Sequence, residues 1–428
     1  MLIHELHQIF LKHPIVSTDT RNIIPNSLFF ALKGEHFDAN SFAAEALQKE
    51  AAYVVIDALE FHKPENKRYI LVENVLETLQ KLAQFHRRYL NIPIVGLTGS
   101  NGKTTTKELM LAVLSQKYTA KATQGNLNNH IGVPLTLLSF DTSTEIGIVE
   151  MGANHQKEIE FLCTLAQPNL GYITNFGKAH LEGFGGVEGI IKGKSELYNY
   201  LIENNQKVLV NLDDEIQVEK TKNAHKFTFS FHNPTADVLF SDVTINPMVS
   251  LSTNNQPIQS NLIGDYNALN IAAAISLGFY FKIGIEAIKK GIENYIPTNN
   301  RSQIIKKNTT TIILDAYNAN PSSMKAALDN FLLLVNPKKQ VILGDMFELG
   351  EFSSEEHQKI VDFLTNQPSI QSVLIGKYFY EAKNEASNCR FYENLDSFKP
   401  NFEPNFTDGL LLIKGSRGMA LEKIIDWF

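Results

Sequence analysis

The chain has 428 residues, and its 43% hydrophobic and 20% charged residues are typical of a globular protein of about three domains, at roughly 150 residues each. Its 39 Lys and Arg residues against 46 Asp and Glu residues give a net charge of −7, which disfavours a general binder of nucleic acid or anionic membranes. The two cysteines, Cys163 and Cys389, lie far apart and have no metal-binding spacing, so a reducing cytoplasm is expected. We expect no signal peptide, because the N-terminus lacks a basic segment followed by an apolar core. We expect no membrane span, because no apolar run reaches about 18 residues.

The first domain is predicted to cover residues 1–88. Apolar residues at helical spacing open the chain, and the segments 27–34, 43–49 and 52–56 follow as strand, helix and strand. Such alternation is typical of a small α/β domain. Asp19 and Arg21 precede the first strand, where residues of this kind are usually solvated surface and indicate no function by themselves.

A helix at 75–89 leads into a second domain, predicted to cover residues 89–297, which opens with a phosphate-binding loop. An apolar run is followed by a Gly-rich turn and then by a helix that begins at Lys103. Glycines at positions 96, 99 and 102 would allow backbone N–H groups to approach phosphate oxygens. Lys103 can reach the outer phosphates, and the Thr104 hydroxyl can ligate Mg²⁺. Leu97 departs from the usual pattern, because it stands where the first glycine is expected.

Polar residues follow two further strands of this domain. Glu150 ends the strand 146–150, where a carboxylate can either ligate Mg²⁺ or cap the next helix. His180 follows the strand 170–175, and we favour a role as a ligand over a structural one. Between the loop and these strands, the Asn- and Gly-rich segment 123–134 is either ligand-facing or a capped turn.

The rest of this domain contains one more apolar strand, at 207–212, and β-rich segments. The residues 227–263 alternate with period two, which predicts antiparallel strands covering the sheet edge. Asn267 and Asn270 then share one face at the start of an Ala-rich helix. Their carboxamides could cap the helix or read the edge of a base, and the residues alone leave both open.

The third domain is predicted to cover residues 298–428, after a linker at 297–300. Strands are expected at 309–314, 340–343, 372–375 and 410–413, and helices from Pro321, around 355–364 and at 419–427. Each strand tends to end in polar or Gly-rich residues, which predicts a doubly wound, Rossmann-like sheet with a ligand crevice at the carboxyl ends of its strands.

These motifs together resemble the Mur ligase family of peptidoglycan precursor synthesis, over essentially the whole chain. The run Gly-Leu-Thr-Gly-Ser-Asn-Gly-Lys-Thr-Thr (96–105) matches the family's loop, including the Leu97 departure. The motifs that resemble the members adding D-alanyl-D-alanine are Asp19-Thr20-Arg21, 28–35, Asp315-Ala316-Tyr317-Asn318-Ala319-Asn320-Pro321, 343–351 and Lys414-Gly415-Ser416-Arg417. Two departures are Tyr266, where relatives often have His, and Asp38-Ala39-Asn40, where they tend to have Asp-Gly-His.

The resemblance implies roles for particular residues. The implied ATP-binding residues are Gly99, Ser100, Asn101, Gly102, Lys103, Thr104, Thr105, Asn267, Asn270, Arg301 and Asp315. The implied residues for a UDP-linked substrate are Asp19, Arg21, Lys33, Asn128 and Asn129, and those on the dipeptide side are Tyr317, Asn318, Asn320 and Ser416. The implied catalytic residues are Lys103, Glu150, His180 and Lys194, and the implied metal set is Thr104, Glu150, His180 and Lys194. Lys194 matches a lysine that is carbamylated from CO₂, with Lys192 as a nearby competitor.

The implied reaction is ATP- and Mg²⁺-dependent joining of D-alanyl-D-alanine to UDP-N-acetylmuramoyl-tripeptide through an acyl phosphate, by a cytoplasmic monomer. Two alternatives are a folylpolyglutamate synthase-like ligase and a P-loop ATPase that is not a ligase. The 90 or so residues before the loop argue against the first, and a requirement for an amine would argue against the second. The third residue of the tripeptide, the domain arrangement and the base that deprotonates the amine are left open.

Overall fold

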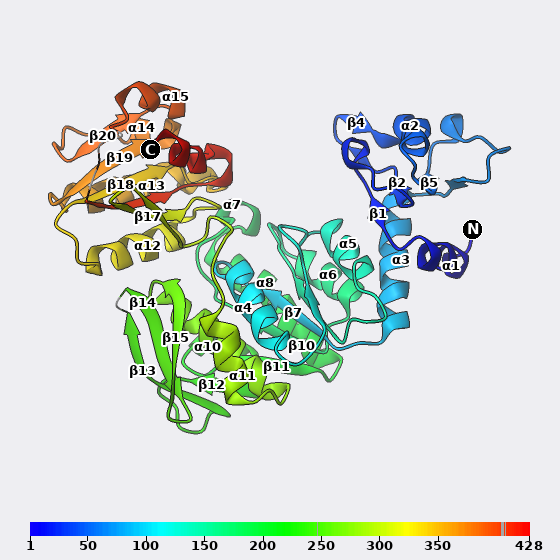
Figure 1. The fold of residues 1–428 in the computed structure, drawn as a ribbon, viewed down its shortest axis with the longest axis horizontal. Helices are drawn as coiled ribbons and strands as arrows, with labels where there is room; N and C mark the ends of the chain where they lie inside the picture. Colours follow the sequence, from blue (N-terminus) through cyan, green and yellow to red (C-terminus); the bar gives the residue numbers. More distant parts are fainter. Residues whose placement is uncertain (246, 404–405, 407) are drawn as a thin grey trace.

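The computed structural model describes residues 1–245, 247–403, 406 and 408–428. Within these residues, three large sheets of four, nine and six strands follow one another along the chain, and a two-stranded sheet accompanies the first. Figure 1 shows the N-terminal part in blue and the C-terminal part in yellow to red on opposite sides of the central part in cyan and green. Among the described residues, no helix is both long enough and apolar enough to cross a membrane.

The N-terminal part is a parallel sheet of order β1-β2-β5-β6 with helices around it. Its elements are α1 (Ile3–Lys12), β1 (Val16–Ser17), η1 (Thr20–Asn22), β2 (Leu28–Phe30), β3 (Lys33–Gly34), β4 (Phe37–Asp38), η2 (Ala39–Phe42), α2 (Ala43–Gln48), β5 (Tyr53–Ile56), η3 (Leu59–Phe61), β6 (Tyr69–Leu71) and α3 (Val75–Leu90). The side chain of Asn74 caps α3 by accepting the N–H of Glu77. α3 buries Leu79, Leu82 and Ala83, and it connects this part to the central one (Figure 1).

The central part has the strand order β15-β14-β13-β12-β11-β10-β7-β9-β8. Its elements are β7 (Ile94–Thr98), α4 (Lys103–Leu114), β8 (Ala120–Ala122), α5 (Gly132–Leu138), β9 (Ile146–Glu150), α6 (Glu158–Ala166), β10 (Leu170–Ile173), α7 (Leu181–Phe184), α8 (Val187–Glu203), β11 (Lys207–Asn211), α9 (Glu215–Lys220), β12 (His225–Ser230), β13 (Val238–Ile245), β14 (Met248–Thr253), β15 (Gln256–Ile263), α10 (Tyr266–Tyr280) and α11 (Ile285–Glu293). β7 is buried along its whole length and pairs in parallel with β9 and β10. The carboxyl ends of these three strands therefore meet at one edge of the sheet.

The direction predicted for the strands in 227–263 was partly wrong. β12 pairs in parallel with β11, and β13 pairs in parallel with β12, so only β13, β14 and β15 form an antiparallel unit. The helix α9 lies between β11 and β12 and provides the crossover that parallel pairing requires. Alternating hydrophobicity identifies a strand but does not fix its direction.

The C-terminal part has the strand order β16-β17-β21-β18-β19-β20, and among its described strands only β16 is antiparallel to its neighbour. Its elements are β16 (Gln303–Lys307), β17 (Thr310–Asp315), α12 (Pro321–Leu333), β18 (Lys339–Gly344), η4 (Gly350–Phe352), α13 (Ser353–Thr365), β19 (Ile370–Ile375), α14 (Lys377–Glu381), β20 (Cys389–Tyr392), α15 (Leu395–Phe398), η5 (Lys399–Asn401), β21 (Leu410–Lys414), η6 (Arg417–Met419) and η7 (Leu421–Trp427). The predicted α-helix at 419–427 is instead two 3₁₀ segments, interrupted at Ala420 by a left-handed φ of 50°. The edge strands β16 and β20 were not predicted.

Candidate nucleotide and metal site

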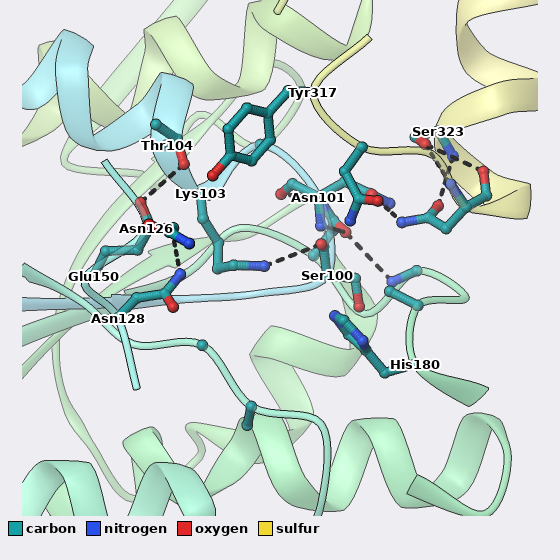
Figure 2. A pocket seen from close by; sticks show the side chains of 18 of the residues that line it. Ser100, Asn101, Lys103, Thr104, Asn126, Asn128, Glu150, His180, Tyr317 and Ser323 are labelled. Atoms are coloured by element: carbon teal, nitrogen blue, oxygen red, sulfur yellow. Dashed lines mark hydrogen bonds between the residues drawn. The ribbon is translucent and has the colours of Figure 1, made fainter. Parts of the chain in front are cut away.

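A cavity of about 1070 Å³ lies where the central part faces the C-terminal part. Residues from the ends of β7, β9 and β10 line one side, and residues that follow β17 and β18 line the other. In Figure 2, Tyr317 reaches toward Lys103 and Thr104 from the C-terminal part. The predicted residues that line the cavity are Ser100, Asn101, Gly102, Lys103, Thr104, Thr105, Asn128, Asn129, Glu150, His180, Asn267, Asn270, Arg301, Asp315, Tyr317, Asn318 and Asn320.

The turn between β7 and α4 requires glycine at two positions. Gly99 and Gly102 have φ values of 144° and 77°, which residues with a side chain rarely adopt. A Cβ on Gly102 would lie 2.6 Å from the Asn270 Oδ1, and one on Gly99 would lie 1.9 Å from the Thr174 Oγ1. Gly96, in contrast, lies inside β7 between Met151 and Pro168, so its predicted approach to phosphate was wrong.

Lys103 is folded back onto its own loop. Its Nζ donates to the carbonyl oxygens of Gly99 at 2.7 Å and Ser100 at 3.2 Å. Burial lowers the pKa of Lys103, with Glu150 opposing and Arg301 adding to this effect. An anion in the cavity would offer this amine a stronger partner than two neutral carbonyl groups.

Glu150, at the end of β9, is fully engaged by its neighbours. Its two carboxylate oxygens accept the Thr104 hydroxyl at 3.0 Å and the Asn128 amide at 2.9 Å. The Nζ of Lys107, a buried residue one turn along α4 from Lys103, lies 3.8 Å from Oε2. A carboxylate and a hydroxyl in contact are hard oxygen donors, which fits a Mg²⁺ that also binds nucleotide phosphates. Among the described residues, no group of three or more His, Cys, Asp or Glu is placed to hold a metal ion. Nucleotide phosphates would therefore have to supply further ligands.

His180 and Lys194, predicted as metal ligands, lie in different surroundings. The His180 Nδ1 lies 2.5 Å from the Glu348 Oε2 of the C-terminal part, and this contact holds the pKa of Glu348 below its usual value. The Lys194 side chain is fully buried, donates to the Ala153 carbonyl at 3.1 Å and lies 4.8 Å from the centre of the Phe184 ring. Burial lowers the pKa of Lys194 well below its usual value, and Lys103 adds to this. Lys194 is not part of the cavity lining.

The exposed Lys192 has none of these features, so burial separates the two candidates for carbamylation. A neutral amine is the form that reacts with CO₂, and burial favours that form at Lys194.

Asn267 and Asn270, at the start of α10, are hydrogen-bonded to each other and to neighbouring residues. The Asn270 amide donates to the Asn267 Oδ1 at 2.8 Å, and the Thr106 hydroxyl donates to the Asn270 Oδ1 at 3.0 Å. Asn267 donates to the carbonyl of Ile263, the last residue of β15, at 2.7 Å. The side chain that caps α10 is that of Asp265, which accepts the N–H of Tyr266, so neither asparagine caps the helix. Tyr266, the departure noted above, pairs its hydroxyl with that of Ser302 at 2.9 Å.

The C-terminal residues meet the central part directly. Asn320 caps α12, and its amide donates to the Asn101 Oδ1 at 2.6 Å. Asp315, at the end of β17, lies 2.5 Å from the Nζ of Lys414. Ser416 accepts the N–H of Phe347 at 2.9 Å and is buried beside the cavity rather than in its lining.

Two family profiles match this chain, the Mur ligase middle domain at residues 97–278 and the Mur ligase, glutamate ligase domain at residues 300–391. The UDP-N-acetylmuramoyl-tripeptide–D-alanyl-D-alanine ligase of Bacillus subtilis (strain 168) is 37% identical over 424 residues, which cover 96% of this chain and 92% of that protein.

This chain belongs to the Mur ligase family.

Solved structures agree with the fold of this Mur ligase. A crystal structure of MurF from Acinetobacter baumannii has a TM-score of 0.84 at 29% identity and covers 96% of this chain and 92% of that one. The MurF ligase of Thermotoga maritima, solved in complex with ADP, has a TM-score of 0.83 at 24% identity and covers 98% and 97% of the two chains. The family and the fold class predicted from the sequence are thereby confirmed.

The predicted site residues fall into two groups in this Mur ligase. Asn128 and Asn129, assigned to the UDP-linked substrate, line the cavity beside the phosphate-binding loop. Asp19, Arg21 and Lys33 lie on the N-terminal part and are not in the cavity lining. Arg21 pairs with Asp19 at 2.6 Å, and Lys33 pairs with Asp57 at 2.9 Å.

Two residues of the site were not singled out from the sequence. Lys107 follows Lys103 by four residues, which places both on one face of α4, and this spacing was a usable signal. Glu348 lies in the quoted 343–351 motif, but its contact with His180 depends on how the two parts meet and has no signal in the sequence.

Proposed function

We propose that this Mur ligase joins D-alanyl-D-alanine to UDP-N-acetylmuramoyl-tripeptide at the expense of ATP. The observation that carries the proposal is a cavity that has the phosphate-binding loop on one wall and an amide-rich wall from the C-terminal part facing it. The full-length likeness to ligases of this name supports the choice of substrates.

The proposed reaction has two steps. The terminal carboxylate of the UDP-linked peptide attacks the γ-phosphorus of ATP and releases ADP, which leaves an acyl phosphate. The amine of the dipeptide, after losing a proton, attacks the acyl carbon, and inorganic phosphate leaves as the amide bond forms. Two anions approach each other in the first step, so catalysis depends mainly on positioning and charge neutralisation.

Lys103 supplies positive charge at the loop in this scheme. Its amine leaves the Gly99 and Ser100 carbonyls when phosphate oxygens arrive, which requires only a rotation of the side chain. Thr104 and Glu150 would hold Mg²⁺, which supplies further charge neutralisation when bound. Asn128 keeps the Glu150 carboxylate in one orientation through its hydrogen bond.

A carbamate on Lys194 is a further part of the proposal. The buried, neutral amine meets the chemical requirement for taking up CO₂, and the resulting anionic oxygens would suit a hard cation better than the amine does. His180 lines the cavity and would have to leave its contact with Glu348 to act as a ligand. A second Mg²⁺ held by this pair is part of the same proposal.

We also propose one substrate for each of three domains, residues 1–88, 89–297 and 298–428. The first would bind the UDP moiety, the second ATP, and the third the dipeptide. Both cysteines are unpaired and buried, which supports a reducing cytoplasm as the place of action. A monomer would suffice for the scheme, because one chain supplies every residue in it.

The proposal is tested by following phosphate release from purified protein with ATP, UDP-N-acetylmuramoyl-tripeptide and D-alanyl-D-alanine, each omitted in turn. We expect sustained release only when all three are present, together with a product that contains the dipeptide. Release at the same rate without D-alanyl-D-alanine would overturn the ligase assignment and favour an ATPase.

A further inference from the structure

The helix that follows the phosphate-binding loop also contacts the linker to the C-terminal part. Lys107 of α4 faces Glu150, and the next residue, Glu108, faces the linker between α11 and β16. The Tyr295 hydroxyl donates to one Glu108 oxygen at 2.5 Å, and the Asn299 amide donates to the other at 2.5 Å. A carboxylate that receives one donor on each oxygen holds both donors in a fixed geometry.

The other end of the linker is anchored as well. The Ser302 N–H donates to the Asp315 Oδ1 at 3.1 Å, and the Ser302 hydroxyl meets that of Tyr266 at 2.9 Å. The N–H of Tyr317 donates to the Asn300 carbonyl at 3.2 Å. Arg301 therefore lies between two anchors, one on α4 and one on β17 and α10.

The Arg301 side chain is directed to the cavity. Its guanidinium carbon lies 3.4 Å from the centre of the Tyr317 ring, and both residues line the cavity. Its charge acts on Lys103, whose pKa it helps to lower. No carboxylate of the described residues lies within ion-pair distance of Arg301, so its charge is available to an anionic ligand.

The backbone on both sides of Arg301 has a conformation that an isolated linker would rarely adopt. Asn300 and Ser302 have φ values of 52° and 49°, in the left-handed region. Asparagine tolerates this region, whereas serine adopts it only when its surroundings hold it there. The anchors therefore decide where Arg301 points.

We propose that Glu108 is a positioning residue, which clamps the linker to the phosphate-binding helix and thereby holds Arg301 over the nucleotide site. Loss of the clamp leaves the loop and Lys103 in place but frees Arg301 from its position. Only the kinetic measurements of this inference rest on the proposed function. Its nucleotide-binding measurements do not, because ADP affinity can be measured without ligation.

The test is a double-mutant cycle of Glu108→Ala, Arg301→Ala and the combined variant, with ADP affinity measured by calorimetry and KM for ATP and kcat measured separately. We expect Glu108→Ala to weaken ADP binding and to raise KM for ATP about fivefold to tenfold, with the melting temperature nearly unchanged. The combined variant should bind ADP no more weakly than Arg301→Ala. Glu108→Gln, which keeps one acceptor oxygen, should lie between wild type and Glu108→Ala.

Tyr295→Phe and Asn299→Ala each remove one half of the clamp and should each show part of the loss. If Glu108→Ala does not fold, the same measurements are made on these two variants instead. Glu77→Ala is the matched control, because Glu77 is an exposed glutamate that pairs with Lys81 on α3. Wild-type ADP affinity in Glu108→Ala, or losses that multiply in the combined variant, would overturn the inference. A wild-type protein that binds ADP but does not ligate would instead count against the proposed function, and the ADP measurements would still decide the role of Glu108.

Discussion

The nucleotide side of this Mur ligase and the side predicted for its UDP-linked substrate differ in how far their polar groups are buried and paired. Thr104 and Glu150 are 6% and 2% exposed, and the Thr104 hydroxyl donates a hydrogen bond to the Glu150 carboxylate. Arg21 and Asp19 also pair with each other, but their side chains are 85% and 39% exposed. One set is enclosed by the central sheet, whereas the other lies on the surface of the N-terminal part.

This difference in burial indicates which of the two sides must change its surroundings when a ligand binds. A buried, paired set is already positioned for charge stabilisation, because solvent does not need to reorganise around it. An exposed pair in water contributes little until a ligand or a second domain excludes solvent from it. The N-terminal residues are therefore expected to act only when the UDP-linked substrate bridges them to the cavity.

The largest effect is expected for Lys103→Ala. The variant should lose ligation by at least about 10³-fold while keeping its fold, because the charge at the phosphates is lost but no core contact is. Turnover in the phosphate-release assay measures the loss of ligation, and the melting curve shows whether the fold is kept. Exposed Lys81→Ala should behave as wild type. Near-normal turnover of Lys103→Ala would remove the loop from the mechanism.

The next effect is expected for Lys194→Ala. We expect a loss of about 10²-fold or more, because the variant cannot form the proposed carbamate and so lacks its negative charge. Short carboxylic acids added to this variant should restore part of the activity, since they can occupy the space of the carbamate. The exposed Lys192→Ala is the matched control and should need no rescue. Full activity of Lys194→Ala without any added acid contradicts the carbamate.

The contacts of the site could not all be predicted equally well from the sequence. The strand–loop–helix at 94–114 and the position of Glu150 followed from local pattern, because parallel strands bring their carboxyl ends together. The contact of His180 with Glu348 did not, since it joins residues 168 positions apart across two sheets. Pattern also misplaced Gly96, which packs inside β7, and the direction of β12, which depends on a crossover helix.

A smaller effect is expected on the exposed side, for Arg21→Ala. KM for the UDP-linked substrate should rise about tenfold with KM for ATP unchanged, because one charged hydrogen-bonding group is lost from an exposed site. The Arg21 guanidinium holds the pKa of Asp19 at about 2, and without it this pKa rises toward the ordinary value of 3.8. Asp19 therefore stays ionised at neutral pH in the variant as well. Arg390→Ala is the matched control, since Arg390 is an exposed arginine paired with Glu403 in the C-terminal part. Equal changes for both substrates would argue against a separate UDP side.

The smallest effect is expected at two buried histidines where α1, α3 and the central part meet. His7 of α1 contacts His86 of α3, and His86 contacts the central part. His86 Nε2 lies 2.9 Å from the Phe140 carbonyl and must donate to it, so His86 Nδ1 accepts from His7 Nε2 at 3.0 Å. Two neutral rings satisfy both contacts, and His7 Nδ1 is buried without a partner among the described residues. Burial, with His86 adding, lowers the pKa of His7 to about 4, and burial also lowers the pKa of His86.

Because an unfolded histidine titrates near about 6.5, the unfolded chain binds more protons than the native one below that pH. The free energy of unfolding should therefore be fully retained above about pH 6.5 and should fall as the pH drops toward 4. In His7→Phe, which keeps the aromatic contacts with Phe10 and Tyr89, the fall measured by urea denaturation between pH 7 and 5.5 should be smaller. The exposed His225→Gln should leave it unchanged. Equal losses of stability in His7→Phe and wild type over this range would mean that protonation of the buried His7 does not destabilise the native protein. The buried histidines would then differ from exposed groups in position only, and not in their effect on stability.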